Sequence, residues 1–160
     1  MLDGGRLSPK SLGTAVLFGV LALDRATKAW AIGSLAPRGS VRVAPFLRLT
    51  YVENTGAAFG VLVGRNDLFI VVAVVLMGAL LAWRRRLPPG RRWAHLGLGL
   101  ILAGAVGNLY DRIAYGYVVD FVDLIVWPVF NVADSAISVG AGLLALDLAS
   151  GNGGPRKGGA

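Results

Sequence analysis

Residues 107–137 read GNLYDRIAYGYVVDFVDLIVWPVFNVADSAI, and we interpret the rest of the chain as the scaffold that supports this stretch. It places four aspartates, one arginine and two asparagines inside or beside apolar segments: Asp111, Asp120, Asp123, Asp134, Arg112, Asn108 and Asn131. A carboxylate near the middle of a bilayer costs roughly 2.5–3.5 kcal/mol on insertion scales. Several such carboxylates in one stretch therefore indicate a functional site.

The composition is that of an integral membrane protein. Hydrophobic residues make up 55% of the chain, charged residues make up 16%, and the mean hydropathy is +0.64. A soluble domain carries about 25% charged residues. The 160 residues provide for a single membrane-embedded domain, residues 1–160, of about four spans at roughly 20 residues each.

The charge and the rarer residues exclude several classes of function. A net charge of +7 would suit a nucleic-acid partner, but no basic stripe interleaved with aromatic residues is present. The chain has no cysteine, so it has neither a disulfide framework nor a thiolate nucleophile. With a single histidine in addition, a zinc site is not expected.

Four apolar segments predict an all-α membrane protein with four transmembrane helices. The expected spans are residues 11–32, 68–86, 93–111 and 130–149. The remaining end of the chain, residues 150–160, has the composition of a flexible tail.

The first span resembles a secretory signal, because basic residues precede the apolar run at 12–23 and Ala29-Trp30-Ala31 mimics a cleavage site. However, Asp24, Arg25 and Lys28 lie where a cleavable signal carries small neutral residues. We therefore expect a retained span. Asp24 and Lys28 are four residues apart and can pair along one helix face.

Residues 41–54 have a different period. Apolar residues alternate with others from Leu47 to Tyr51, and Pro45 opposes a helix, so we expect a small extracytoplasmic β segment. The following residues, 53–60, combine asparagine, glycine and small side chains. They fit either a tight turn near a ligand or a plain connecting loop.

The distribution of lysine and arginine predicts the orientation. Nine of the sixteen lie in the N-terminus, the loop after the second span and the tail. The opposite side holds four: Arg38, Arg42, Arg48 and Arg65. By the positive-inside rule both ends are cytoplasmic. Apart from Asp3 and Asp147, the acids lie at or towards the outer half, so the site should face outward.

The polar residues of the chain allow the chemistry of paired aspartates. The single histidine, His95, is far in depth from the acids, and no zinc-protease or phosphate-loop motif is present. Two neighbouring aspartates can share one proton and so provide a base and an acid for hydrolysis of a peptide bond. Asp134 is one candidate, and its partner could be Asp111, Asp120 or Asp123.

Each polar residue also has a structural interpretation. Asn131 with Asp134 fits a helix N-cap with an acid in the first turn, which is compatible with catalysis. An ion pair of Asp111 with Arg112 is favoured over a catalytic Asp111. For Asp123, an interfacial surface position is favoured over a catalytic role. Asp120 has apolar neighbours and no adjacent base, which suits a raised pKa.

Five motifs follow one another in a fixed order. They are Asp24 with Thr27-Lys28, Asn54-Thr55-Gly56-Ala57-Ala58-Phe59, Gly107-Asn108-Leu109-Tyr110-Asp111-Arg112, Val118-Val119-Asp120-Phe121 and Phe130-Asn131-Val132-Ala133-Asp134-Ser135-Ala136-Ile137. Over residues 12–149 the chain resembles lipoprotein signal peptidase, the bacterial signal peptidase II family. One motif alone is weak, whereas five in order are specific. Ala103 replaces a residue that is often glycine in the family, which touches no catalytic group.

The resemblance implies an aspartic endopeptidase of the bacterial cytoplasmic membrane that cuts prolipoproteins before a diacylglyceryl-modified cysteine. It implies Asp120 and Asp134 as the catalytic dyad, and no cofactor or metal. Its supporting residues around the dyad and the substrate backbone correspond to Asn54, Gly56, Asn108, Asp111, Arg112, Asn131 and Asp24. Diacylated prolipoproteins and membrane lipid are the implied partners, and sensitivity to globomycin is also implied.

Two other classes remain as alternatives. A small proton-coupled transporter or channel would use outer-half acids as a relay, but it would need acids across both leaflets. Four spans without inverted repeats also fit a transporter poorly. A scaffold that binds partner helices would explain spans rich in small residues but not the clustered carboxylates.

Overall fold

The computed structural model describes residues 7–56 and 65–150. Part of the predicted turn at 53–60 and nearly all of the predicted tail at 150–160 lie outside the described residues. The elements are α1 (Pro9–Trp30), a π-helical turn η1 (Ala31–Leu35), β1 (Ser40–Ala44), β2 (Leu47–Asn54), α2 (Asn66–Arg86), α3 (Arg92–Ala114), β3 (Val118–Asp123) and α4 (Val132–Ala149).

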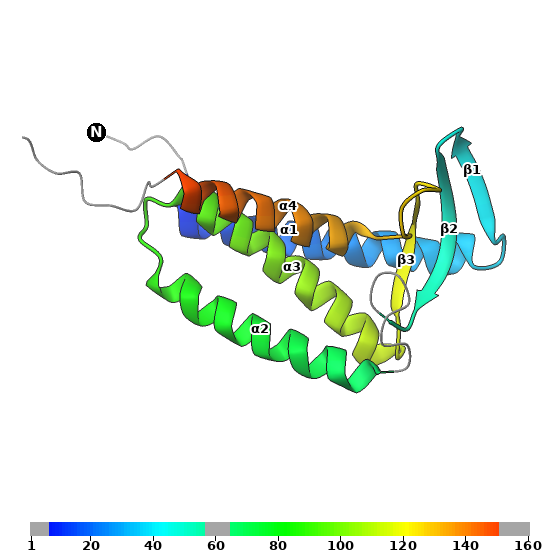
Figure 1. Ribbon diagram of the computed structural model, residues 1–160, viewed down its shortest axis with the longest axis horizontal. Helices are drawn as coiled ribbons and strands as arrows, with labels where there is room; N and C mark the ends of the chain where they lie inside the picture. The colour runs from blue at the N-terminus through cyan, green and yellow to red at the C-terminus, as the bar shows by residue number, and fades with distance from the viewer. Residues whose placement is uncertain (1–6, 57–64, 151–160) are drawn as a thin grey trace, which may run out of the picture.

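The helices form a bundle with α3 at its centre. Helix α3 packs against α1, α4 and α2, while α2 lies at the edge of the bundle and the sheet lies at one end (Figure 1). The predicted mostly helical architecture with a small sheet is confirmed. Among the described residues, α2, α3 and α4 are long and apolar enough to cross a membrane.

Glycines let three of the helices approach backbone to backbone. A Cβ on Gly97 of α3 would lie 2.7 Å from the carbonyl oxygen of Gly140 on α4, and the reverse contact would be 2.6 Å. A Cβ on Gly99 would collide with the backbone of Gly13 on α1. Small residues permit such close packing in membrane helices, where apolar burial contributes little. The spacing of α1, α3 and α4 therefore depends on residues that lack side chains.

The sheet contains a strand that the periodicity of the sequence did not predict. Strands β1 and β2 form a hairpin in the region of the expected β segment, and β3 pairs antiparallel with β2, with Val52 opposite Asp120 and Asn54 opposite Val118. The β3 residues are almost all buried, so their sequence lacks the alternation of a half-exposed strand. Because of this pairing, Asp120 lies on the sheet and not on a helix.

The turn η1 and strand β3 attach the sheet to the bundle. Ala31 and Leu35 of η1 form a buried cluster with Val119 and Phe121 of β3. The first helical segment therefore extends beyond the predicted boundary at residue 32, because its last turn covers the sheet. Helix α4 starts at Val132, two residues later than predicted.

The glycine contacts predict opposite results for two positions on α4. Gly140→Ala places a methyl group against the α3 backbone, and such overpacking costs typically 1–3 kcal/mol. Gly142 has no atom near its Cβ direction, so Gly142→Ala should stay within about 1 kcal/mol of the wild type. Thermal unfolding in detergent measures both variants, and equal midpoints would contradict the packing argument.

Candidate active site

Two aspartates from different elements meet at the sheet end of the bundle. Asp120 of β3 accepts hydrogen bonds from the side-chain amides of Asn54 (2.8 Å, to Oδ2) and Asn131 (2.6 Å, to Oδ1). Asp134 of α4 accepts at Oδ1 from Nδ2 of Asn108 over 2.8 Å. Its Oδ2 accepts from the backbone N–H of Asn131 over 3.1 Å. Each carboxylate is thus held at both oxygens.

Asn131 connects the two aspartates. Its side chain is the N-cap of α4, because Oδ1 accepts from the backbone N–H of Asp134 over 2.9 Å. The Asp134 carboxylate in turn accepts from the backbone N–H of Asn131. This capping box confirms the predicted cap. The amide nitrogen of the same side chain donates to Asp120, so one completely buried residue fixes both acids.

The environment of Asp120 favours its protonated form. Burial, followed by the nearby charge of Asp134, raises the pKa of Asp120 to about 7, against the opposing hydrogen bonds from Asn54 and Asn131. The raised pKa expected from its apolar neighbours is therefore confirmed, although Asp134 is a further cause that spacing alone did not identify. A carboxyl group that titrates near neutrality can donate or accept a proton.

A cluster of four charges, with Asp24, Lys28 and Asp111 buried and Arg25 partly exposed, lies behind the two aspartates. Lys28 of α1 contacts Asp24 at 3.2 Å and Asp111 at 2.8 Å, and Arg25 contacts the same two carboxylates at 3.0 and 2.7 Å. The predicted Asp24–Lys28 pair is confirmed. The predicted Asp111–Arg112 pair is wrong, because the α1 cations reach Asp111 across the helix interface.

The cluster also holds the backbone on either side of the aspartates. Oδ1 of Asp24 accepts from the backbone N–H of Ala133, and Oδ2 of Asp111 accepts from that of Val119. Ala133 precedes Asp134, and Val119 precedes Asp120. The two buried acids therefore position the main chain that carries the central pair.

Arg112 serves a different contact. Its guanidinium donates to the carbonyl oxygen of Gly56 over 3.2 Å and lies over the ring of Phe69, 4.3 Å from the centroid. Asn66, at the start of α2, donates to the backbone of Arg112 over 3.0 Å. Arg112 thereby connects the end of α3 to α2 and to the segment after β2, where Gly56 also donates to Asn54.

The structure separates the site residues into groups. The central group is Asp120, Asp134, Asn54, Asn108 and Asn131. Asp24, Asp111, Gly56 and Arg112 surround it. Lys28 donates to Asn108 over 2.8 Å, a contact that neither its predicted pairing with Asp24 nor its place in the first motif indicates. Asn66 has no signal in the sequence.

Asp123 lies apart from this group, although it is only three residues from Asp120. Its side chain pairs with Arg48 at 3.0 Å and accepts from the backbone N–H of Ile125 over 2.7 Å. These contacts, the backbone one first, hold the pKa of Asp123 below its usual range. The residue is nearly buried rather than at the surface as predicted, since Arg48 and Thr50 cover it.

Two apolar grooves flank the central group. One, of about 370 Å³, has Asp134 in its wall beside Leu124, Trp127, Phe130 and Val139. The other, of about 280 Å³, lies between α2 and α3 and has Asn108 and Arg112 among apolar side chains. An apolar ligand in either groove would therefore lie beside a polar site residue.

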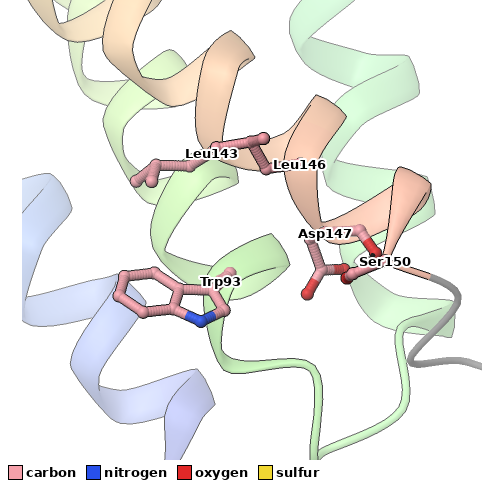
Figure 2. Close-up of a pocket in the computed structure, with 5 residues that line it drawn as sticks. All are labelled: Trp93, Leu143, Leu146, Asp147 and Ser150. Atoms are coloured by element: carbon pink, nitrogen blue, oxygen red, sulfur yellow. Dashed lines mark hydrogen bonds between the residues drawn. The ribbon is translucent and has the colours of Figure 1, made fainter.

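A third pocket lies at the opposite end of the bundle. Figure 2 shows Trp93 of α3 together with Leu143, Leu146 and Asp147 of α4 and Ser150, which follows that helix. The carboxylate of Asp147 is paired with Arg91 at 2.6 Å, so it offers no free acid. Within residues 7–56 and 65–150, no group of three or more acidic, histidine or cysteine side chains is arranged to hold a metal ion.

A helical membrane bundle with two asparagine-bound aspartates at one end has the fold and site of a membrane-embedded aspartic peptidase. The family model described as signal peptidase (SPase) II matches residues 16–150. The chain belongs to this family.

Curated relatives and solved structures agree with this assignment. The lipoprotein signal peptidase of Moorella thermoacetica is 47% identical over 130 residues, covering 81% of this chain and 87% of the relative. That of Pseudoalteromonas translucida is 42% identical over 140 residues, covering 82% and 84%. A bacterial membrane enzyme solved by the in meso method at 2.3 Å resolution is 28% identical, with a TM-score of 0.83 over 93% of this chain and 94% of that one.

The double role of Asn131 predicts a large effect of its removal. Asn131→Ala deletes the α4 cap, worth typically about 1 kcal/mol, and leaves the buried carboxylate of Asp120 without one of its donors. We expect a clear drop in the thermal unfolding midpoint in detergent. Ser138→Ala, at an exposed site on the same helix, is the control and should leave the midpoint unchanged. Equal midpoints for the two variants would refute the bridging role.

Proposed function

We propose that this chain removes signal peptides from diacylglyceryl-modified prolipoproteins, cutting before the lipidated cysteine, and that Asp120 and Asp134 perform the hydrolysis. Membership of the signal peptidase II family supports the activity. The observation that carries the assignment of residues is the contact of Asn131 with both aspartates. Two acids from distant parts of the chain are thereby held at one place.

The reaction needs one proton on the pair. The ionised aspartate takes a proton from water as the water oxygen attacks the peptide carbonyl carbon, and the protonated aspartate gives its proton to the carbonyl oxygen. The tetrahedral intermediate then breaks at its C–N bond. The amine leaves with the proton taken from water, and a hydroxyl proton returns to the other aspartate, so the pair is restored.

The surrounding residues orient this pair. Asn54, Asn108 and Asn131 supply N–H groups to the carboxylates, and Asp24 and Asp111 hold the adjacent backbone. Gly56 and Arg112 form a contact at the edge of the site, where an extended substrate backbone would pass.

The grooves beside the pair suit a substrate that is itself a membrane component. A prolipoprotein presents an apolar signal helix and acyl chains next to the bond to be cut. Apolar walls that end at Asp134 or Asn108 would keep these parts in lipid or in a lipid-like environment. Membrane lipid is accordingly a partner, no cofactor takes part, and a cyclic peptide such as globomycin would compete for the same site.

We propose that the single domain spans the bacterial cytoplasmic membrane four times, with α1 as the first span. Its 22 residues correspond to roughly 33 Å of helix, comparable to the hydrocarbon thickness. Its charges near the sheet end are paired within the bundle. The arginines at Arg84–Arg86 lie at the end away from the sheet (Figure 1), which supports cytoplasmic termini and an outward-facing site.

The proton-transporter alternative fits the structure less well. A relay needs titratable groups spaced across the membrane. In the described part of α4, Asp134 lies at the sheet end and Asp147 near the other, and Asp147 is neutralised by Arg91. The acids therefore form a local site rather than a path.

Replacing either central aspartate tests the proposal directly. We expect Asp120→Asn and Asp134→Asn to abolish cleavage of a diacylated prolipoprotein by the purified enzyme while the protein remains inserted, because an amide supplies neither the base nor the acid. Asp123→Asn on the same strand is the matched control and should keep most of the activity. Turnover by Asp120→Asn or Asp134→Asn at the wild-type rate would remove that residue from the mechanism.

The pKa of Asp120 predicts the alkaline side of the pH profile. Because this pKa is raised to about 7, the pair keeps its proton below that pH and loses it above. Without the proton the carbonyl oxygen has no acid, so kcat/KM should fall about tenfold per pH unit above roughly pH 7. Initial cleavage rates across roughly pH 5–9 measure this, and a rate that keeps rising with pH would contradict it.

A further inference from the structure

The two aspartates of the proposed dyad are not equivalent, and the difference originates in α1. Building on the proposed function, we infer that Lys28 is a positioning residue that acts through Asn108 to keep Asp134 ionised and the shared proton on Asp120. Asp134 is then the base that activates water, and Asp120 is the acid. Lys28 itself contacts neither aspartate directly in this arrangement.

The ammonium group of Lys28 has all of its donors engaged. Nζ lies 2.8 Å from Oδ1 of Asn108, 2.8 Å from Oδ2 of Asp111 and 3.2 Å from Oδ2 of Asp24. An ammonium group has three N–H donors and no acceptor. The side chain is 1% exposed, so water does not replace these partners. Lys28 is thus fixed in place by two carboxylates and directs its third donor at an amide.

This third donor determines which way the Asn108 amide faces. Because Lys28 can only donate, its hydrogen-bond partner on Asn108 must be the oxygen and not the NH₂ group. The NH₂ group must then point to the other side, where it donates to Oδ1 of Asp134 over 2.8 Å. Asn131 also donates to Oδ1 of Asn108, over 3.2 Å, which favours the same orientation. A reversed amide would place NH₂ against the ammonium and oxygen against the carboxylate.

The oriented amide makes the surroundings of the two acids unequal. Asp134 accepts hydrogen bonds from this N–H and from a backbone N–H at the positive end of α4. The backbone donor cannot rotate away from the carboxylate. Among the donors in the described residues, Asp120 receives only side-chain amides, from Asn54 and Asn131. A backbone N–H at a helix N-terminus and an amide polarised by a neighbouring cation stabilise an anion more than side-chain amides without a cation beside them. The negative charge of the pair therefore belongs on Asp134.

The contacts from Lys28 through Asn108 to Asp134 are surrounded by further charged groups from several elements. Those of α1, α3 and β3 are Asp24, Arg25, Lys28, Asp111, Arg112 and Asp120. Asp24 and Asp111 are balanced by Arg25 and Lys28, so the cluster is neutral as a whole. From β2 the uncharged Asn54 faces the pair. Losing Lys28 removes both a donor to Asn108 and one positive charge.

Two neutral replacements of similar size separate these effects. Lys28→Met has neither charge nor donor, whereas Lys28→Gln has no charge but keeps an N–H donor, on a side chain that is one atom shorter than lysine. With full-length enzyme in detergent and a diacylated prolipoprotein, we expect Lys28→Met to lower kcat about tenfold or more, with KM changed less than about twofold. Its acidic limb should move to higher pH by roughly one unit. Lys28→Gln should retain several times more activity than Lys28→Met.

Arg25→Met is the matched control. Arg25 contacts the same two carboxylates as Lys28 but makes no contact with Asn108, so its loss tests the charge cluster alone. We expect its acidic limb to stay closer to that of the wild type than the limb of Lys28→Met. Identical profiles for Lys28→Met, Lys28→Gln and Arg25→Met would show that Lys28 only balances charge, and would overturn the inference.

Further variants keep the test decisive. Should Lys28→Met not yield folded protein, Asn108→Leu removes the same donor from Asp134 at the other end of the chain of contacts. Its acidic limb must also move to higher pH, and an unmoved limb would refute the positioning role. Lys28→Met with a wild-type profile, alongside inactive Asp120→Asn and Asp134→Asn, overturns the inference and leaves the proposed function intact.

Discussion

The structure depends on the buried ion cluster in which Lys28 and Arg25 of α1 meet Asp24 and Asp111. Such charges are costly to bury, and removing one partner of a buried pair costs about 3–5 kcal/mol. Here the charges balance, and the carboxylate oxygens also take backbone N–H groups of α4 and β3. One set of electrostatic contacts therefore fixes the distance between α1 and α3 and aligns the main chain on both sides of the site. The close approach of Gly107 to Asp24 belongs to the same arrangement, because any side chain at Gly107 would collide with that carboxylate.

The candidate active site illustrates how a membrane protein can build a precise polar centre from few residues. Strand β3 brings Asp120 to the end of the bundle, the N-cap of α4 brings Asp134, and Asn131 joins them. Each asparagine uses its oxygen for one partner and its nitrogen for another, so each amide has a defined direction. Such a network is rigid only when all members are satisfied. This explains why the acids, amides and cations of the site occur together in the sequence motifs.

The sequence was sufficient for much of the fold and for the central residues of the site, but not for their connections. Hydropathy predicted the helices, alternation predicted the β segment that forms β1 and β2, and the Asn131–Asp134 spacing predicted the cap. Strand β3 was not predicted, because a segment buried on both faces shows no alternation of apolar and polar residues. Its pairing with β2 is also a long-range contact. The partner of Asp111 was mispredicted for a related reason: its neighbour Arg112 is adjacent in sequence, whereas Arg25 and Lys28 are adjacent only after α1 packs on α3.

Helix α2 differs from the other helices in that none of its side chains is buried by the bundle. A helix of this kind has hydrocarbon as its main solvent, and its backbone bonds are satisfied internally wherever it stands. Its position is then set by lipid on one side and by a few contacts with α3, Arg112 among them, on the other. Bilayer thickness and lateral pressure consequently act on this helix more directly than on α1, α3 or α4. The half of the molecule that carries the two aspartates is packed within the bundle, while one wall of the groove between α2 and α3 is open to the membrane.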